Sequence, residues 1–180
     1  MKLQIKSYRK YGPDMLGMAL VVFLLGASDL CFAQNTENLP PNVLITNAAW
    51  EAFNGEMYES AIKKVAECID DFAPTAQRQH RELVDNADPL PPEGKVMDNK
   101  MKKQILERGL VNDVATCWFI KGRSLEKLKK TKGAIVAYCE TAKYIYARTY
   151  DPSWDGFWSP AKVANDRVLS LGGKCNHNNN

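Results

Sequence analysis

The sequence predicts an all-α protein built from antiparallel helical hairpins. Three observations lead to this fold class. Apolar residues recur every three or four positions through most of the chain, which is the spacing of one helix face. Short breaks rich in glycine, proline or lysine separate these blocks, as expected where consecutive helices return antiparallel. No stretch shows the alternation of apolar and polar residues that marks a strand.

Residues 1–33 have the pattern of a secretory signal peptide. Four basic residues precede Met15–Ala27, an uncharged and mostly apolar run of 13 residues, whereas a membrane-spanning helix needs about 20. Cys31 and Ala33 are small residues two positions apart, typical of a cleavage site. We expect cleavage after Ala33, with lipidation at Cys31 and an uncleaved anchor as alternatives. We therefore predict an exported protein, periplasmic or extracellular, with no membrane span after signal cleavage.

The chain beyond the signal is nearly neutral. The full sequence of 180 residues has a net charge of +3 and is 45% hydrophobic. The signal contains four basic and two acidic residues, so residues 34–180 carry only +1. A charge this small argues against nucleic acid as a partner, and the composition is that of a globular domain.

The first helical hairpin follows a lead-in over 34–42, which is polar and proline-bearing and therefore expected to be flexible. Helical spacing begins at residue 43, and Asn54-Gly55 marks a break. A second helix is predicted from Tyr58 to Phe72, ended by Pro74. The apolar positions of the two helices are Val43, Ile45, Ala49, Trp50 and Phe53, then Tyr58, Ala61, Ile62, Val65, Ile69 and Phe72.

The middle of the chain is less regular. Residues 75–86 are polar and compatible with a helix. The segment 87–95 contains three prolines and is predicted to be a loop, because proline disrupts a helix interior. A charged helix is expected over 98–108.

The second hairpin has the strongest helical pattern. Its first helix carries an apolar face over five turns, and its partner begins after a lysine-rich turn near residues 130–132. An aromatic, turn-rich loop covers 150–158. Ser159-Pro160 then opens a last helix that ends at Gly172-Gly173, and residues 173–180 are expected to be a disordered tail. The apolar faces of the second hairpin are Leu110, Val114, Ala115, Trp118, Phe119, Gly122, Leu125 and Leu128, then Ala134, Ile135, Tyr138, Ala142, Ile145 and Tyr146.

These two hairpins resemble the tetratricopeptide repeat (TPR) family, whose unit is a 34-residue helix–turn–helix. In the second hairpin, Gly122 and Ala134 stand where that motif places small residues at the contact between its helices. The equivalent Ala61 and Ala134 are 73 residues apart, where two intact repeats would give 68. The middle region therefore fits one degenerate repeat with an insertion at the proline loop. The resemblance covers about two fifths of the chain.

The resemblance implies a short right-handed superhelix over residues 43–172, with the last helix as a cap. It also implies a binding scaffold, with a groove lined by the first helix of each hairpin, and no chemistry of its own. We therefore expect a non-catalytic protein that recognises a protein or peptide partner in the cell envelope. The residues expected at the groove are Trp50, Phe119, Arg123 and Lys127.

The aromatic loop offers an alternative function. Trp154 and Trp158 stand beside Asp155, and flat rings next to a carboxylate suit binding or hydrolysis of a cell-wall polysaccharide. The competing interpretation is structural, with these rings folded over the end of the last hairpin to seal its core. A third possibility is a structural subunit of a larger assembly.

Four cysteines follow the signal: Cys68, Cys117, Cys139 and Cys175. Export permits disulfides, but the spacing does not select a pairing. The alternative is that the first three are small core residues. Histidine occurs only at positions 80 and 177, and no phosphate loop or metal motif is present. We expect no cofactor, no metal site and no catalytic residue, although an enzyme is not excluded.

Overall fold

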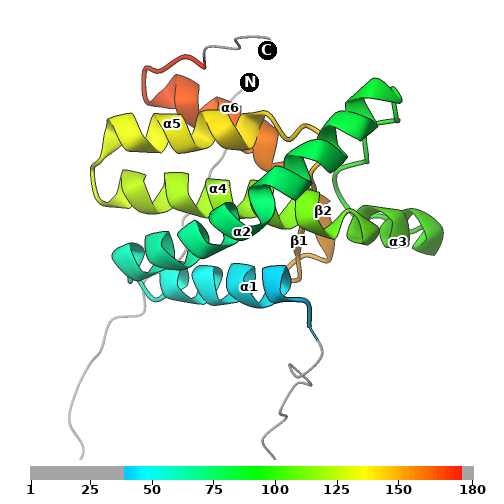
Figure 1. Cartoon of the computed structure of the whole chain (residues 1–180), viewed down its shortest axis with the longest axis horizontal. Helices are drawn as coiled ribbons and strands as arrows, with labels where there is room; N and C mark the ends of the chain where they lie inside the picture. Colours follow the sequence, from blue (N-terminus) through cyan, green and yellow to red (C-terminus); the bar gives the residue numbers. More distant parts are fainter. Residues whose placement is uncertain (1–38, 176–180) are drawn as a thin grey trace, which may run out of the picture. The chain divides into compact units, whose positions relative to one another are not determined.

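The computed structural model describes residues 39–175, which form six helices and a two-stranded sheet (Figure 1). The bounds are α1 (Pro41–Asn54), α2 (Tyr58–Asp85), α3 (Asn99–Glu107), α4 (Gly109–Lys127), α5 (Thr131–Ala142), β1 (Thr149–Asp151), β2 (Gly156–Trp158) and α6 (Pro160–Ser170). In Figure 1, α1, α4 and α5 lie side by side and α2 crosses them obliquely. The fold is therefore mostly helical, as predicted, but the sheet means that it is not purely α.

The first core lies where α1, α2 and α4 pack against one another. Most of its buried side chains are small, so that the three helix backbones approach closely. Phe53 and the half-buried Trp50 close the core at the end of α1. Its aliphatic members with no exposed surface are Ala49, Ala61, Val65, Ala76, Val114, Ala115, Ile120 and Ala147.

The second core joins α4, α5 and α6, and Phe119, Ala134, Tyr138, Ala164 and Val168 form its centre. Gly122 allows the ring of Tyr138 to lie directly on α4, because a Cβ at this glycine would be only 2.6 Å from two ring carbons. This confirms the prediction that Gly122 and Ala134 mark a close approach of two helices.

Helix α2 differs from the prediction, because Pro74 does not end it. The helix runs unbroken to Asp85, and residues 75–85 are its second half. A proline inside a helix costs about 3 kcal/mol or more. Packing offsets that cost. Pro74 itself is exposed, but residues on both sides of it are buried in the first core, namely Cys68, Ile69, Ala73 and Ala76.

Two disulfides connect neighbouring helices. Cys68 on α2 bonds Cys117 on α4, and Cys139 on α5 bonds Cys175 after α6. The alternative of unpaired core cysteines was therefore wrong.

Both ends of the helical domain are more ordered than predicted. The second disulfide holds Gly173–Cys175 against α5, so the expected tail does not begin at residue 173. At the other end, α1 already begins at Pro41, because Asn42 is buried and donates a 2.5 Å hydrogen bond to Asp113 on α4. The predicted signal, residues 1–33, lies outside the described residues. Among the residues that are described, no helix is long and apolar enough to cross a bilayer.

The proline segment forms a loop, as predicted, and it runs beside the sheet. Strands β1 and β2 form an antiparallel hairpin in which Thr149 pairs with Trp158 and Asp151 with Gly156. Gly94 from the proline loop exchanges two backbone hydrogen bonds with Phe157, of 2.7 and 2.9 Å. Strands of three residues carry no readable alternation, which explains why the sequence predicted only a turn-rich loop here.

Candidate functional site

A pocket of about 720 Å³ lies between the helices and the hairpin. Three helices contribute to its walls, each from the side that faces β1 and β2. The lining residues are Asn47, Trp50 and Asn54 of α1, Phe119 and Arg123 of α4, Val163 of α6, and Thr149, Tyr150, Asp151, Pro152, Trp154 and Trp158 of the hairpin. A volume of this size is typical of small-ligand and peptide side-chain sites.

The floor of the pocket is aromatic and fixed by packing. The Phe119 side chain is 2% exposed. Its ring centroid lies 4.9 Å from that of Trp158, edge to face, and 6.4 Å from that of Trp50. All three rings pack in the second core, and Trp50 also packs against the first, so the floor is held by the same contacts that stabilise the helices.

Arg123 supplies positive charge at the α4 wall. Its guanidinium carbon lies 5.2 Å from the ring centroid of Phe53 and 5.9 Å from that of Phe119, within range of cation–π attraction. Within residues 39–175, Arg123 forms no ion pair with a carboxylate. The stacked rings therefore hold a half-buried cation at the pocket while leaving it available to an anionic group.

Trp154 lies at the rim and is held by the glycine that follows it. Its side chain is 45% exposed. A Cβ at Gly156 would lie 1.7 Å from Cζ3 of this indole, so the ring packs directly on the glycine backbone. Asp151 shapes the same turn, since its Oδ1 accepts hydrogen bonds from the backbone N and the Oγ of Ser153, at 2.9 and 2.6 Å. These bonds hold the pKa of Asp151 below its usual value, so the carboxylate is charged at neutral pH.

Asp155 is turned away from the pocket and anchors the hairpin from outside. Its carboxylate accepts a 2.8 Å hydrogen bond from the Tyr150 hydroxyl. It also pairs with Lys102 of α3 at 3.3 Å and with Lys95 at 3.4 Å. The bond from Tyr150, followed by those from the two lysines, lowers the pKa of Asp155. The hairpin is thereby tied to α3 and to the proline loop.

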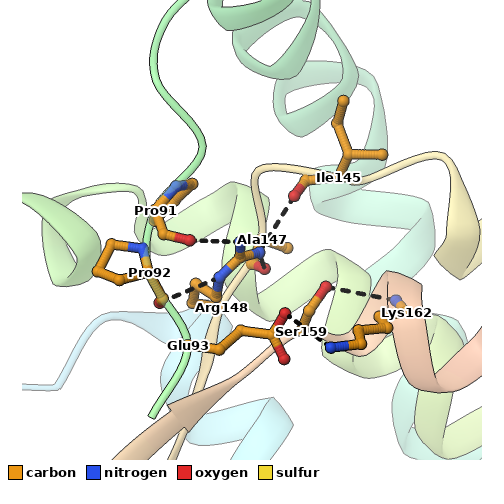
Figure 2. Close-up of polar contacts among 8 residues, drawn as sticks. All are labelled: Pro91, Pro92, Glu93, Ile145, Ala147, Arg148, Ser159 and Lys162. Carbon is orange, nitrogen blue, oxygen red and sulfur yellow. Dashed lines mark hydrogen bonds and ion pairs between the residues drawn. The ribbon is translucent and has the colours of Figure 1, made fainter. Parts of the chain in front are cut away.

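Arg148 holds the proline loop against the start of β1 (Figure 2). The residue is 6% exposed, and its guanidinium donates to four backbone carbonyls: those of Pro91, Pro92, Ile145 and Ala147. Burial lowers its pKa, while the nearby Glu93 acts in the opposite direction. One buried side chain therefore fixes the segment that enters β1 and the loop that pairs with β2.

The two sets of residues predicted separately converge on this pocket. Trp50, Phe119 and Arg123 come from the expected groove, and Trp154 and Trp158 come from the alternative polysaccharide site. The remaining two predicted residues do not line it. Lys127 is exposed one turn beyond Arg123, and Asp155 faces the lysines described above.

The structural interpretation of the aromatic loop holds for part of it. Phe157 is buried and Trp158 packs on Phe119, whereas Trp154 remains at the surface. Asn47 and Asn54 also line the pocket, although the sequence did not predict them as site residues. They stand three residues before and four after Trp50, which places all three on one face of α1, and this spacing was the signal that would have found them.

The histidine within residues 39–175 lies away from this pocket. His80 lies on α2 beside the rings of Tyr144 and Tyr146, at 5.4 and 5.6 Å, and does not line the pocket. Burial lowers the pKa of His80. Among residues 39–175, no group of three or more His, Cys, Asp or Glu side chains is arranged to hold a metal ion.

Comparison with known proteins does not place this chain in a family. No family model matches it, and no solved structure matches it. A stretch of 47 residues is 32% identical to part of nuclear envelope integral membrane protein 1 of Xenopus tropicalis. That stretch covers 26% of this chain and 11% of the relative, so the likeness is local.

Proposed function

We propose that this protein is an exported, non-catalytic binding protein that recognises a protein or peptide partner through the pocket between α1, α4, α6 and the hairpin. The observation that carries this proposal is the convergence of residues from four separate elements on one aromatic pocket with a cationic wall. An aromatic floor accepts an apolar side chain, and Arg123 accepts a carboxylate of the partner. Asn47 and Asn54, both exposed at the rim, provide amides for its backbone.

We also propose that the helices are arranged as in a short TPR array. In a TPR array, the first helix of each helical hairpin packs on the second helix of the same hairpin and also on the first helix of the next one. The pairs α1–α2 and α1–α4, and then α4–α5 and α4–α6, follow that order. In this interpretation α1, α4 and α6 line a groove, α6 acts as the cap, and β1 and β2 close one side of the groove to make a pocket.

The predicted location of the protein agrees with this function. The first 33 residues have the pattern of a secretory signal, and two disulfides suit an oxidising compartment. We therefore place the protein and its partner in the cell envelope or outside the cell.

A polysaccharide ligand is the second candidate. It is favoured by one observation, namely that Trp154 and Trp158 line the same pocket as Asp151. Indole rings stack on the apolar faces of sugars, and a carboxylate accepts hydrogen bonds from their hydroxyl groups.

A pull-down from the native envelope fraction separates these functions. The chain is expressed from its full-length sequence, and four forms are compared: wild type, Arg123→Glu, Lys127→Glu and Trp154→Ala. Lys127 is the matched control, because it lies one turn from Arg123 on the same helix but outside the pocket.

The expected result is a recurrent protein or peptide partner that the Arg123 variant loses and the Lys127 variant retains. If both variants lose the partner equally, or both retain it equally, the binding site does not lie in the pocket. Retention on insoluble cell-wall glycan that Trp154→Ala abolishes, without any protein partner, would favour the second candidate. Trp154 is the better probe than Trp158, whose ring packs in the core.

A further inference from the structure

The charged side chains that line the pocket indicate the chemical class of its ligand. Arg123 and Asp151 are the two side chains in the lining that are charged at neutral pH. They have opposite signs and stand on different walls, one on α4 and the other at the end of β1. Tyr150 also lines the pocket, but its hydroxyl is already committed to Asp155.

Neither charge is neutralised by an oppositely charged neighbour within the part of the chain that is described. The partners of Arg123 are two aromatic rings. The groups that hydrogen-bond to Asp151 are the neutral Ser153 and the neutral indole of Trp154, and the two bonds from Ser153 end on Oδ1. The two charges do not pair with each other either. A cation and an anion therefore remain available on separate walls of one aromatic pocket.

This arrangement discriminates between classes of ligand. A ligand that carries only negative charge is attracted by Arg123 and repelled by Asp151. A ligand that carries only positive charge is repelled by Arg123 and attracted by Asp151. A neutral ligand removes water from both charges without replacing it. A dipolar ligand satisfies both walls, provided that its charged groups are separated by an apolar body that covers the rings between them.

We propose, on the basis of the proposed function, that the pocket binds short peptides with both ends free, the carboxylate at Arg123 and the ammonium group at Asp151. The guanidinium forms paired hydrogen bonds with a terminal carboxylate. The ammonium group is held by Asp151, at the rim beside Trp154. Phe119 lies next to Arg123 and Trp50 lies next to Phe119, so the side chain of the last residue is apolar or aromatic.

The volume agrees with a peptide of this length. A pocket of about 720 Å³ accommodates two or three residues and not a long folded segment. The specificity expected of such a site is for the charges of the two ends, because each end is recognised by one charged side chain.

The test uses isothermal titration calorimetry with alanyl-phenylalanine and its end-blocked forms. The N-acetyl form removes the ammonium charge, the C-terminal amide removes the carboxylate charge, and the doubly blocked form removes both. The protein is expressed from its full-length sequence as wild type, Arg123→Gln and Asp151→Asn. Asparagine at 151 retains the side-chain oxygen that accepts from Ser153 and so preserves the turn.

The expected result is that either block weakens binding to the wild type by about tenfold or more, because each leaves one charged side chain covered by the ligand without a partner. In Arg123→Gln the free acid and the amide bind equally, and in Asp151→Asn the free amine and the acetyl form bind equally. Lys127→Gln and Asp166→Asn, both on the surface outside the pocket, retain the wild-type pattern.

Equal binding of all four peptides, or no binding of the free dipeptide at millimolar concentration, overturns this inference. A different result contradicts the proposed function, namely a pull-down in which binding of the partner does not depend on Arg123. A partner that depends on Arg123, together with blocked and free dipeptides that bind alike, would retain the pocket as a peptide site and exclude recognition of free ends.

Discussion

The helical core and the hairpin are stabilised in different ways. Around α1, α2 and α4, stability comes from many small apolar contacts and one buried disulfide, so no single surface residue decides the geometry. Around β1 and β2 it comes from a few polar anchors, mainly Arg148 and Asp155, and from the close contact of Trp154 with Gly156. The pocket takes its floor from the first region and half of its lining from the second. Changes in the core should therefore affect stability, whereas changes in the hairpin should affect binding first.

The largest effect is expected from the disulfide in the core. Replacing Cys68 and Cys117 together by alanine should lower the free energy of unfolding by about 4 kcal/mol, because the bond closes a loop of 49 residues in the unfolded chain. Urea unfolding monitored by circular dichroism measures this loss. A loss below about 1 kcal/mol would mean that packing alone holds α2 against α4.

A smaller but still substantial effect is expected from Arg148, which connects the two regions. Arg148→Met should cost about 3 kcal/mol, because the substitution leaves the carbonyls of Pro91 and Pro92 in the proline loop without their donor. Arg148→Lys is the matched control, since it retains the charge but lacks the planar group that reaches several carbonyls. We expect the lysine variant to be nearly as unstable in thermal unfolding. Full stability of the lysine variant would show that charge, and not the four hydrogen bonds, is what this position requires.

The contact between α1 and α4 should depend on pH through Asp113. Burial raises the pKa of this carboxyl to about 6, although the hydrogen bond from Asn42 acts in the opposite direction. Because the folded state binds the proton more tightly than the unfolded state, the contribution of Asp113 to stability is greatest below pH 4 and is lost as the pH rises through 6.

A comparison with Asp113→Asn isolates this contribution, since asparagine does not titrate. The variant should gain stability relative to wild type, by at most about 3 kcal/mol, between pH 4 and pH 7. Thermal unfolding of both proteins across this range measures the difference. A difference that does not change with pH would contradict the raised pKa.

The smallest effect on stability, and the most informative for binding, is expected at Gly156. Gly156→Ala places a methyl group where the Trp154 ring lies, so the ring must move. We expect a change in unfolding free energy of about 1 kcal/mol or less, a shift in tryptophan fluorescence and a several-fold loss of ligand affinity. In a Trp154→Ala background the same substitution should have no further effect on affinity. An additive loss there would mean that Gly156 acts on the pocket by another route.

The two regions also differ in how far their sequence predicts them. The helices followed from apolar spacing because that spacing records which face is buried, and Gly122 with Ala134 located the close contact of α4 and α5. Pro74 was misjudged because local propensity carries no information about the core on both sides of it. The strands were missed because they are short and depend on a partner at Gly94, 63 residues before Phe157.

The pocket was predicted in two halves that the sequence had no means of joining. Trp50, Phe119 and Arg123 were expected from helix faces, and Trp154 and Trp158 from the composition of a loop. What joins them is the connection between α5 and α6, held in place by Arg148, whose four carbonyl partners leave no pattern in the sequence.

The most direct test of the central claim is site-specific photocrosslinking in the native envelope fraction. A photoreactive residue is placed at Asn54 on the α1 side of the pocket, at Tyr150 on the hairpin side, or at Val136, which is 61% exposed on α5 and outside the pocket. If the pocket is the binding site, the same partner should crosslink from positions 54 and 150 and not from 136. Crosslinking from position 136, or from neither side of the pocket, would contradict the account.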